Sequence, residues 1–300
     1  MPKTKIEIIY QDGDILVINK PSGISVTADR SGQAQLVDIL AEQLGPQKAG
    51  ELRLVHRLDK HTSGVMILAN TPEAQSKFSA YFAKKQVKKT YLALVTGILR
   101  GAEGTIDAPL AHARKKPGLM CIVRKRGKEA ITKWKLLADF GVTALLAVYP
   151  LTGRTHQIRV HLPNIGLPLT IDPLYGNPKP LFLSDFKTHY RLGKGQTEKP
   201  LIERLTLHAY QIEFPKPSSV IPAEAGIHLN TEPSRLDCFI ARLDKKFAAT
   251  IKMLTKHNPK GFDAFLNPDD FSKLINAQRL FGGQCIKHHE SCCCKCGVRK

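Results

Sequence analysis

Short apolar or alternating segments recur along the first two thirds of the chain and predict β-strands. They are rich in Val, Ile, Leu and aromatic residues and are bounded by Gly, Pro, Asn or Asp. These segments are residues 6–10, 15–19, 65–69, 88–97, 131–140, 142–150 and 205–214. The first two flank residues 11–14 and predict a hairpin, and the pair that meets at Gly141 predicts another.

Apolar positions spaced three and four residues apart predict helices between these strands. The helical segments are residues 35–44, 72–85, 156–166, 246–256 and 268–282. Thr71 and Pro72 form a cap and first position for the second of them, and Gly45 and Pro46 end the first. No internal repeat is found. The pattern predicts an α+β fold with a central mixed, largely antiparallel sheet flanked by helices and loops.

The same pattern predicts one main domain with additions near the C-terminus. We expect this domain over residues 1–217, with its core motifs in 6–214. Residues 218–235 mix Pro, Gly and polar residues without a period, so they predict an inserted loop that catalysis does not need. Residues 236–282 predict a helical part that packs on the main domain, and the Cys-rich residues 283–300 predict a disordered tail.

Charge points to the class of partner. Lys and Arg total 45 against 26 Asp and Glu, so the formal net charge is +19 at pH 7. Such a surface attracts polyanions, and nucleic acid is the leading candidate, although a merely soluble basic protein is the simpler alternative. With 300 residues, 42% of them hydrophobic, the chain can bury a sizeable core.

The sequence also indicates the cellular compartment, through features that it does not contain. No apolar run is long enough to span a bilayer, and the N-terminus has no secretory h-region. Five of the seven cysteines crowd residues 285–296, which is not a disulfide framework. We therefore expect a cytoplasmic protein in a reducing compartment.

The first chemically suggestive stretch is LVHRLDKHTSGVMILAN, residues 54–70. A hydrolase triad of His56, Asp59 and Ser63 is disfavoured, because the three crowd into eight residues without a G-x-S-x-G elbow. Asp59 is the more interesting residue, since Arg57 and Lys60 favour its ionised form and an ionised carboxylate suits a nucleophile. The charge pattern alone favours an ordinary Asp that closes a turn.

A second stretch, LTGRTHQIRVHL, spans residues 151–162. It places Arg154 in a Gly-containing loop just before a helix, with Arg159 and His161 behind it. This arrangement suits a carboxylate or a phosphate, although a basic helix that faces solvent has the same pattern.

Metal sites are not expected. His156 and His161 lie about 140° apart around a helix, so they do not face one ion. In the tail, one Cys-x2-His pair and one Cys-x2-Cys pair have zinc-like spacing, but only four residues separate them. Zinc modules need a longer linker to fold around the ion, so we expect no structural zinc.

Six motifs in order resemble one family. HRLDKHTSGVMILA, INKPSGISV, KKTYLALVTG, LTGRTHQIRVHL, IDPLYG and LHA resemble the motif series of the RluA-type RNA pseudouridine synthases over residues 6–214. The resemblance implies the synthase fold and an isomerase, of the intramolecular-transferase kind, that converts uridine in structured ribosomal or transfer RNA to pseudouridine without a cofactor. Many relatives carry an N-terminal S4-type domain, which we do not expect here, because the first strand already belongs to the synthase domain.

The resemblance also implies site residues. Asp59 occupies the position of the catalytic aspartate, and Arg154 that of the arginine paired with it. Tyr91 matches the tyrosine that stacks on the extruded base and helps remove the C5 proton. For substrate binding, the motifs imply Arg57, which enters the RNA stack, Ile158, which lines the pocket, and His56.

Chemistry agrees with the resemblance. The reaction breaks the N-glycosidic bond, turns the base and rejoins it through C5, so a detached fragment must be held away from water. A stacked uridine must first be flipped out, at roughly a few kcal/mol. The alternatives are a noncatalytic RNA-binding protein that keeps the fold and a metal-dependent phosphodiesterase, whose acidic or histidine ligands the sequence does not supply. We expect a monomer without an obligate protein partner or a membrane contact.

Overall fold

A large mixed sheet forms the centre of the molecule. The computed structural model describes residues 5–27, 35–193, 195–215 and 236–258. In these residues a ten-stranded sheet is accompanied by a two-stranded one. The strands of the large sheet are β1 (Glu7–Gln11), β2 (Ile15–Lys20), β3 (Arg53–Leu54), β4 (Ser63–Ala69), β5 (Lys88–Val95), β6 (Glu103–Asp107), β9 (Ile131–Asp139), β10 (Ala144–Pro150), β11 (Leu207–Pro215) and β12 (Leu236–Ile240).

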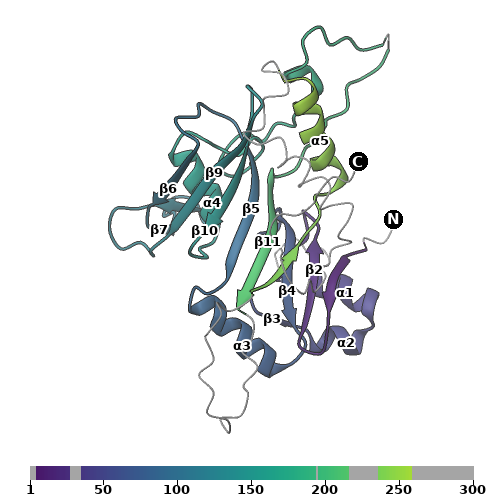
Figure 1. The fold of residues 1–300 in the computed structure, drawn as a ribbon, viewed down its shortest axis with the longest axis vertical. Coiled ribbons are helices and arrows are strands. Elements are labelled where there is room, and N and C mark those ends of the chain that lie inside the picture. Colours follow the sequence, from purple (N-terminus) through teal and green to yellow (C-terminus); the bar gives the residue numbers. More distant parts are fainter. Residues whose placement is uncertain (1–4, 28–34, 194, 216–235, 259–300) are drawn as a thin grey trace, which may run out of the picture.

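Strand order confirms the predicted sheet class. The order is β1-β2-β4-β11-β5-β10-β9-β6, with β3 added on β4 and β12 on β11 (Figure 1). The β4–β11 pair is parallel and the other pairs are antiparallel. The two predicted hairpins are present as β1–β2 and β9–β10. The pattern missed β3, β6, β12 and the small pair β7 (Leu110–His112) and β8 (Met120–Ile122), all of which are two to five residues long.

Four of the five helices in the described residues follow the predicted segments closely, and the short helix that begins at Pro46 was not predicted. The five helices are α1 (Leu36–Leu44), α2 (Pro46–Glu51), α3 (Pro72–Ala83), α4 (Gln157–Asn164) and α5 (Lys245–Lys256), with a 3-10 turn at Leu183–Asp185. Thr71 caps α3 as expected, since its hydroxyl accepts from the Ala74 amide at 3.1 Å. The helix predicted at 268–282, the inserted loop at 218–235 and the tail at 283–300 lie outside the described residues.

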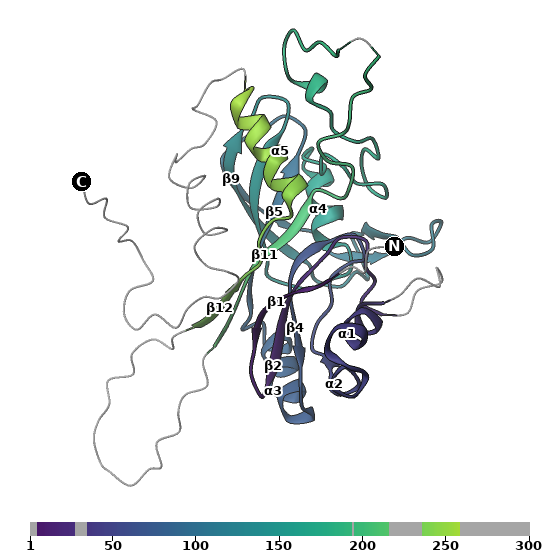
Figure 2. The same cartoon turned by 90° about the vertical axis from the view of Figure 1, so that its right-hand side faces the viewer.

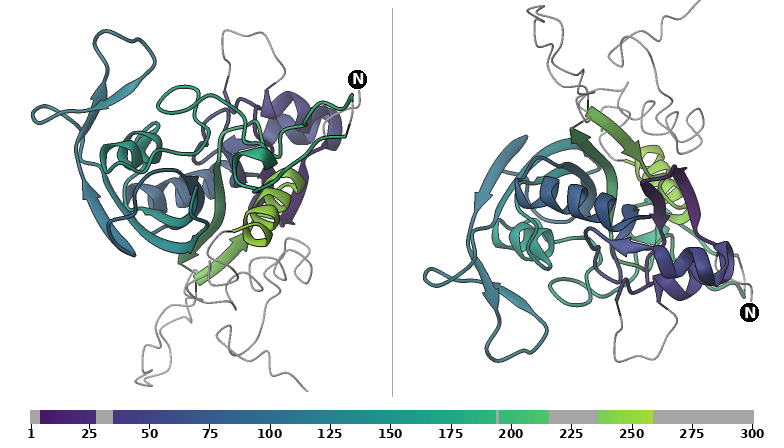
Figure 3. Two further views of the ribbon diagram at one scale, coloured as in Figure 1. Left: turned by 90° about the horizontal axis from the view of Figure 1, so that it is seen from above. Right: turned by 90° about the horizontal axis from the view of Figure 1, so that it is seen from below.

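Strand β5 separates two packed layers. Its side chains alternate between the two faces of the sheet, as a period of two requires. Leu92 and Leu94 pack with α5, whereas Ala93 and Val95 pack with α4. Figures 2 and 3 show α4 and α5 on opposite sides of the sheet. Tyr91 has the same parity as Ala93, so it belongs to the α4 face.

The parallel pair of β4 and β11 joins the two halves of the sheet at close range. Gly64 has φ +120°, and a β-carbon there would overlap the carbonyl oxygen of Ala209. Beside it, the Ser63 hydroxyl donates to Nδ1 of His208 at 2.9 Å, while Nε2 of that ring donates to the Ala241 carbonyl. Ser63 is therefore bound within the sheet and is not activated by His56.

The described residues from Leu236 onward rejoin the same sheet. Strand β12 pairs with β11, and α5 packs its buried Phe247, Ile251 and Leu254 against the sheet. The C-terminal part thus begins as a strand, not as a helix. None of the helices in the described ranges combines the length and apolar content needed to cross a bilayer.

Candidate active site

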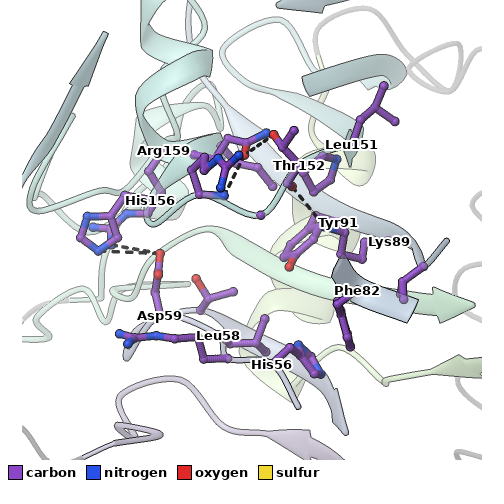
Figure 4. Close-up of a pocket in the computed structure, with 18 of the residues that line it drawn as sticks. His56, Leu58, Asp59, Phe82, Lys89, Tyr91, Leu151, Thr152, His156 and Arg159 are labelled. Carbon is purple, nitrogen blue, oxygen red and sulfur yellow. Dashed lines mark hydrogen bonds and ion pairs between the residues drawn. The ribbon is translucent and has the colours of Figure 1, made fainter. Parts of the chain in front are cut away.

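A pocket of about 450 Å³ opens on the α4 face of the sheet. Five segments line it: the loop before β4, the end of α3, the start of β5, the loop from β10 into α4, and the start of β11. Figure 4 shows how the labelled side chains lie around it. The residues that matter below are Arg57, Asp59, Lys89, Tyr91, Thr152, His156, Ile158 and Arg159. Its volume suits a small ligand.

Asp59 lies on the loop between β3 and β4, with its side chain 20% exposed. The loop turns directly after it, because the Thr62 amide donates to the Asp59 carbonyl at 3.1 Å. The Lys60 carbonyl accepts from the Gly23 amide at 2.9 Å, and the His61 carbonyl accepts from the Ser22 hydroxyl at 2.6 Å. Hydrogen bonds from the segment after β2 to main-chain carbonyls of this loop therefore fix the loop that carries the carboxylate.

Lys20 completes this anchoring. Its side chain is fully buried, and its ammonium donates to the carbonyls of Pro21, Ile24 and Lys60 at 2.9–3.0 Å. Burial lowers the pKa of Lys20 to about 7, and the nearby Asp59 charge opposes that shift. The NKPSG motif thus ties the β2 end to the Asp59 loop.

Arg159 is the arginine beside Asp59. Its Nη1 lies 3.6 Å from Asp59 Oδ2, and its Nε and Nη2 donate to both Asp172 oxygens at 2.9 and 2.7 Å. Burial alone disfavours the charged guanidinium, but the hydrogen bonds and charge of Asp172, followed by Asp59, raise the pKa of Arg159. The guanidinium is therefore charged and fixed in orientation.

This differs from the sequence prediction, which paired Arg154 with Asp59. Arg154 lines the pocket but directs its Nε to the Glu129 carbonyl at 2.9 Å. The physical reason is its place in the loop: α4 begins at Gln157, so Arg159 projects from the first turn toward Asp59. The pattern allowed either arginine of LTGRTHQIR, and the fold selects the second.

His156 flanks the same carboxylate oxygen. Its backbone is left-handed, with φ 54°, and its Nε2 lies 3.9 Å from Asp59 Oδ2. The Tyr175 hydroxyl accepts from the Met120 amide at 2.8 Å, so its proton is free for Nδ1 of His156, also at 2.8 Å. Burial lowers the pKa of His156. The neutral ring thus carries its proton on Nε2, the nitrogen that faces Asp59.

Tyr91 and Ile158 both line the pocket. Burial first, and the Asp59 charge second, raise the pKa of Tyr91, so its hydroxyl stays protonated at neutral pH. Ile158 is 5% exposed and packs with the apolar cluster under α4. Arg57 is exposed at the pocket mouth.

His56 serves the fold. Its Nε2 accepts from the Ile67 amide at 3.0 Å, and its ring stacks on Phe82 with centroids 4.7 Å apart. Burial, followed by the charge of Lys89, lowers the pKa of His56 to about 3. Because the ring stays neutral and its acceptor nitrogen is bound to a main-chain amide, His56 forms part of the pocket wall and is not an acid or base.

Sequence reasoning gave no role to Lys20, Lys89, Asp172 or Tyr175, although Asp172 and Tyr175 stand in IDPLYG. That motif was the available signal. A search of the described residues finds no group of three or more His, Cys, Asp or Glu able to hold a metal. His161 is buried and bonds Thr132 and Ala108. The cysteine pairs of the tail lie outside the described part.

Comparison with known proteins decides the family. The model of a family described as RNA pseudouridylate synthase matches residues 14–164, about half of the chain. The chain belongs to the RluA-type RNA pseudouridine synthases. An uncharacterised RNA pseudouridine synthase of Zymomonas mobilis is 38% identical over 191 residues, which cover 63% of this chain and 87% of that one.

Two further relatives extend the match. Ribosomal large subunit pseudouridine synthase D of Xanthomonas campestris is 36% identical over 240 residues, covering 77% of this chain and 68% of its own. The structure of human RNA pseudouridylate synthase domain containing 4 superposes with a TM-score of 0.58 at 27% identity, covering 83% of this chain and 92% of that one. This pseudouridine synthase is thus an isomerase that acts on RNA.

Proposed function

We propose that this synthase uses Asp59 as the reacting carboxylate on a uridine flipped out of structured RNA, and that its target lies in large-subunit ribosomal RNA. One observation carries the chemical part. Arg159 Nη1 and His156 Nε2 both face Oδ2 of Asp59, at 3.6 and 3.9 Å, and no described residue makes such a contact with Oδ1. The carboxylate is therefore oriented through one oxygen, which leaves the other for substrate.

The pocket supplies what the isomerisation needs. Arg159 and the Nε2 proton of His156 orient the anion, so little reorganisation is required when it attacks. Attack on C1′ of the sugar, attack on C6 of the base, or assistance to loss of a sugar proton all need this geometry. In each route the N1–C1′ bond breaks, the C5–C1′ bond forms and the C5 proton leaves.

Tyr91 and the pocket walls hold the detached base. An aromatic face under the uracil recovers part of the stacking lost on flipping, which amounts to roughly 1 to 3 kcal/mol per base. Arg57 stands exposed at the mouth, where its guanidinium can fill the gap left in the RNA stack. These roles together make Tyr91 the base platform and Arg57 the wedge.

Two observations support the proposed target. Several relatives at 33–36% identity are named as ribosomal large subunit pseudouridine synthases C or D. The net charge of +19 fits a large folded RNA, whose phosphates supply salt-dependent affinity.

The test is to map pseudouridines by carbodiimide primer extension in cells that lack the protein. Wild type should restore at least one signal in large-subunit RNA, whereas Asp59→Asn should restore none while it still binds the transcript. Asp185→Asn, an exposed carboxylate outside the pocket, is the matched control and should restore the signal fully. Restoration by Asp59→Asn would exclude the proposed chemistry, and a signal only in transfer RNA would exclude the proposed target.

A further inference from the structure

Lys89 is a cation in the pocket wall that the mechanism above does not use. It lies on β5, two residues before Tyr91 and on the same face of the strand. Its ammonium donates to the Thr152 carbonyl at 3.1 Å, the contact drawn beside Tyr91 in Figure 4. An ammonium has three protons to donate, so two remain available toward the pocket.

No anion of the described chain neutralises Lys89. The neighbouring Lys85 pairs with Glu129 at 3.2 Å, and Arg159 pairs with two carboxylates, but the ion pairs of the described residues include none for Lys89. A partly buried charge without a counter-charge is costly. Burial lowers the pKa of Lys89 to about 8, and no carboxylate offsets that shift. Asp59 and Lys89 both line the pocket, but the ion pairs of Asp59 in the described residues are with His156 and Arg159 and not with Lys89.

The Lys89 ammonium is accessible from the pocket because the residue beside it, Gly153, has no side chain. A β-carbon added at Gly153 would lie 3.9 Å from Lys89 Nζ, so a larger side chain there would stand over the ammonium. Gly153 also lines the pocket, between Thr152 and Arg154. An opening that leads to a cation without a counter-charge suits an anionic ligand.

We propose that Lys89 binds a backbone phosphate adjoining the flipped uridine. The inference rests on the proposed function, because the ligand is part of the same nucleotide strand. Base and ribose are neutral at pH 7, and the phosphodiester is the anion that this strand brings to the pocket. With the carboxylate at one end of the pocket and Lys89 beyond Tyr91, the nucleotide is held at two places, at its reacting atoms and at its phosphate.

The experiment measures tritium release from unmodified transcripts of large-subunit ribosomal RNA and transfer RNA, labelled at C5 of uridine, at several KCl concentrations. Loss of one phosphate contact reduces the slope of log kcat/KM against log salt by about 0.7 to 0.9. Lys89→Met should show this reduction and a KM raised about tenfold, with kcat within threefold of wild type. Lys89→Arg should retain the slope, since a guanidinium also binds phosphate.

Lys252→Met is the matched control, because it removes the same charge from an exposed position on α5, on the opposite face of the sheet. Its slope should equal that of wild type. Gly153→Val keeps the lysine but covers it, and should reduce the slope as Lys89→Met does, which also serves if the methionine variant is unstable. An unchanged slope in both pocket variants, or an equal reduction in Lys252→Met, overturns the phosphate site.

The two proposals fail in different ways. Tritium release by Asp59→Asn at the wild-type rate refutes the proposed chemistry whatever Lys89 does. If wild type is active, Asp59→Asn is inactive and the Lys89 variants change kcat alone, then Lys89 only supports the Thr152 loop and the phosphate site is refuted while the proposed function stands.

Discussion

Asp59 is held by the main chain, whereas Arg159 and His156, which face it, are held by other side chains. The Asp59 loop is fixed by backbone carbonyls that accept from Lys20, Gly23 and Ser22. On the opposite wall, Asp172 fixes the guanidinium and Tyr175 fixes the imidazole. The wall that carries Asp59, the carboxylate wall, is therefore sensitive to changes in backbone geometry. The wall that carries Arg159 and His156, the cation wall, is sensitive to single side-chain substitutions.

The largest expected effect comes from removing the partner of Arg159. Asp172→Asn leaves a buried guanidinium with half its counter-charge, since both side chains are 2% exposed. Breaking such a pair on one side costs about 3–5 kcal/mol, measured as the free energy of urea unfolding. Glu203→Gln breaks the exposed pair with Lys246 and should cost less than about 1 kcal/mol. Equal costs would show that burial of the Asp172 pair has no special weight.

The next largest effect is a difference in kcat between substitutions of the two pocket arginines, Arg159 and Arg154. Arg159→Met removes a preoriented donor beside Asp59 and should lower kcat about 10²–10³-fold. Arg154→Met, whose Nε contacts only a carbonyl, should leave kcat within about threefold at saturating RNA. Single-turnover rates of tritium release measure both. The reverse ranking would restore Arg154 as the partner of Asp59.

On the carboxylate wall, His56 makes stability depend on pH. Its pKa is about 3 in the folded protein against 6.5 as the ordinary value, so the unfolded chain binds the extra proton. The stabilisation is fully present above pH 6.5 and is lost toward pH 3, at up to about 1.4 kcal/mol per pH unit. His56→Gln should flatten this dependence relative to wild type, as urea midpoints at pH 4.5–6.5 measure. Exposed His112→Gln should not flatten it.

The smallest effect is expected at Tyr175, two contacts away from the reacting atoms. Tyr175→Phe removes the hydroxyl that fixes the tautomer of His156, a loss of about 1.5 kcal/mol or tenfold in kcat. The ring remains beside the Arg159 guanidinium, but the Met120 amide loses its acceptor, so the free energy of unfolding should fall by about 1–3 kcal/mol. Tyr190→Phe, outside the pocket, is the control. A kcat equal to wild type would mean that His156 needs no fixed tautomer.

The sequence predicted the local features of the fold and the motif residues of the pocket well. The β-strand segments and the caps of α3 are local features, and the structure confirms them. Asp59, Tyr91 and Ile158 were expected in one pocket from motif resemblance, and all three line it. The strands missed between β5 and β9 are too short for a period of two to be visible among their charged neighbours.

The rest depended on contacts that sequence spacing does not encode. Arg154 and Arg159 stand in one motif, and the direction of each side chain is decided by where α4 begins. Asp172 lies 13 residues beyond Arg159, and Thr152 lies 63 residues beyond Lys89. Pairs at such separations follow from the assembled sheet, so their roles became visible only in three dimensions.

Gly64 has a consequence for how this enzyme can change over time. Because no side chain separates β4 from β11 there, the spacing between these two strands is set by backbone in contact with backbone. Such a spacing does not vary with the size of core residues. A side chain at position 64 therefore cannot be accommodated by smaller core residues nearby, because the atoms that it would meet belong to the main chain of β11.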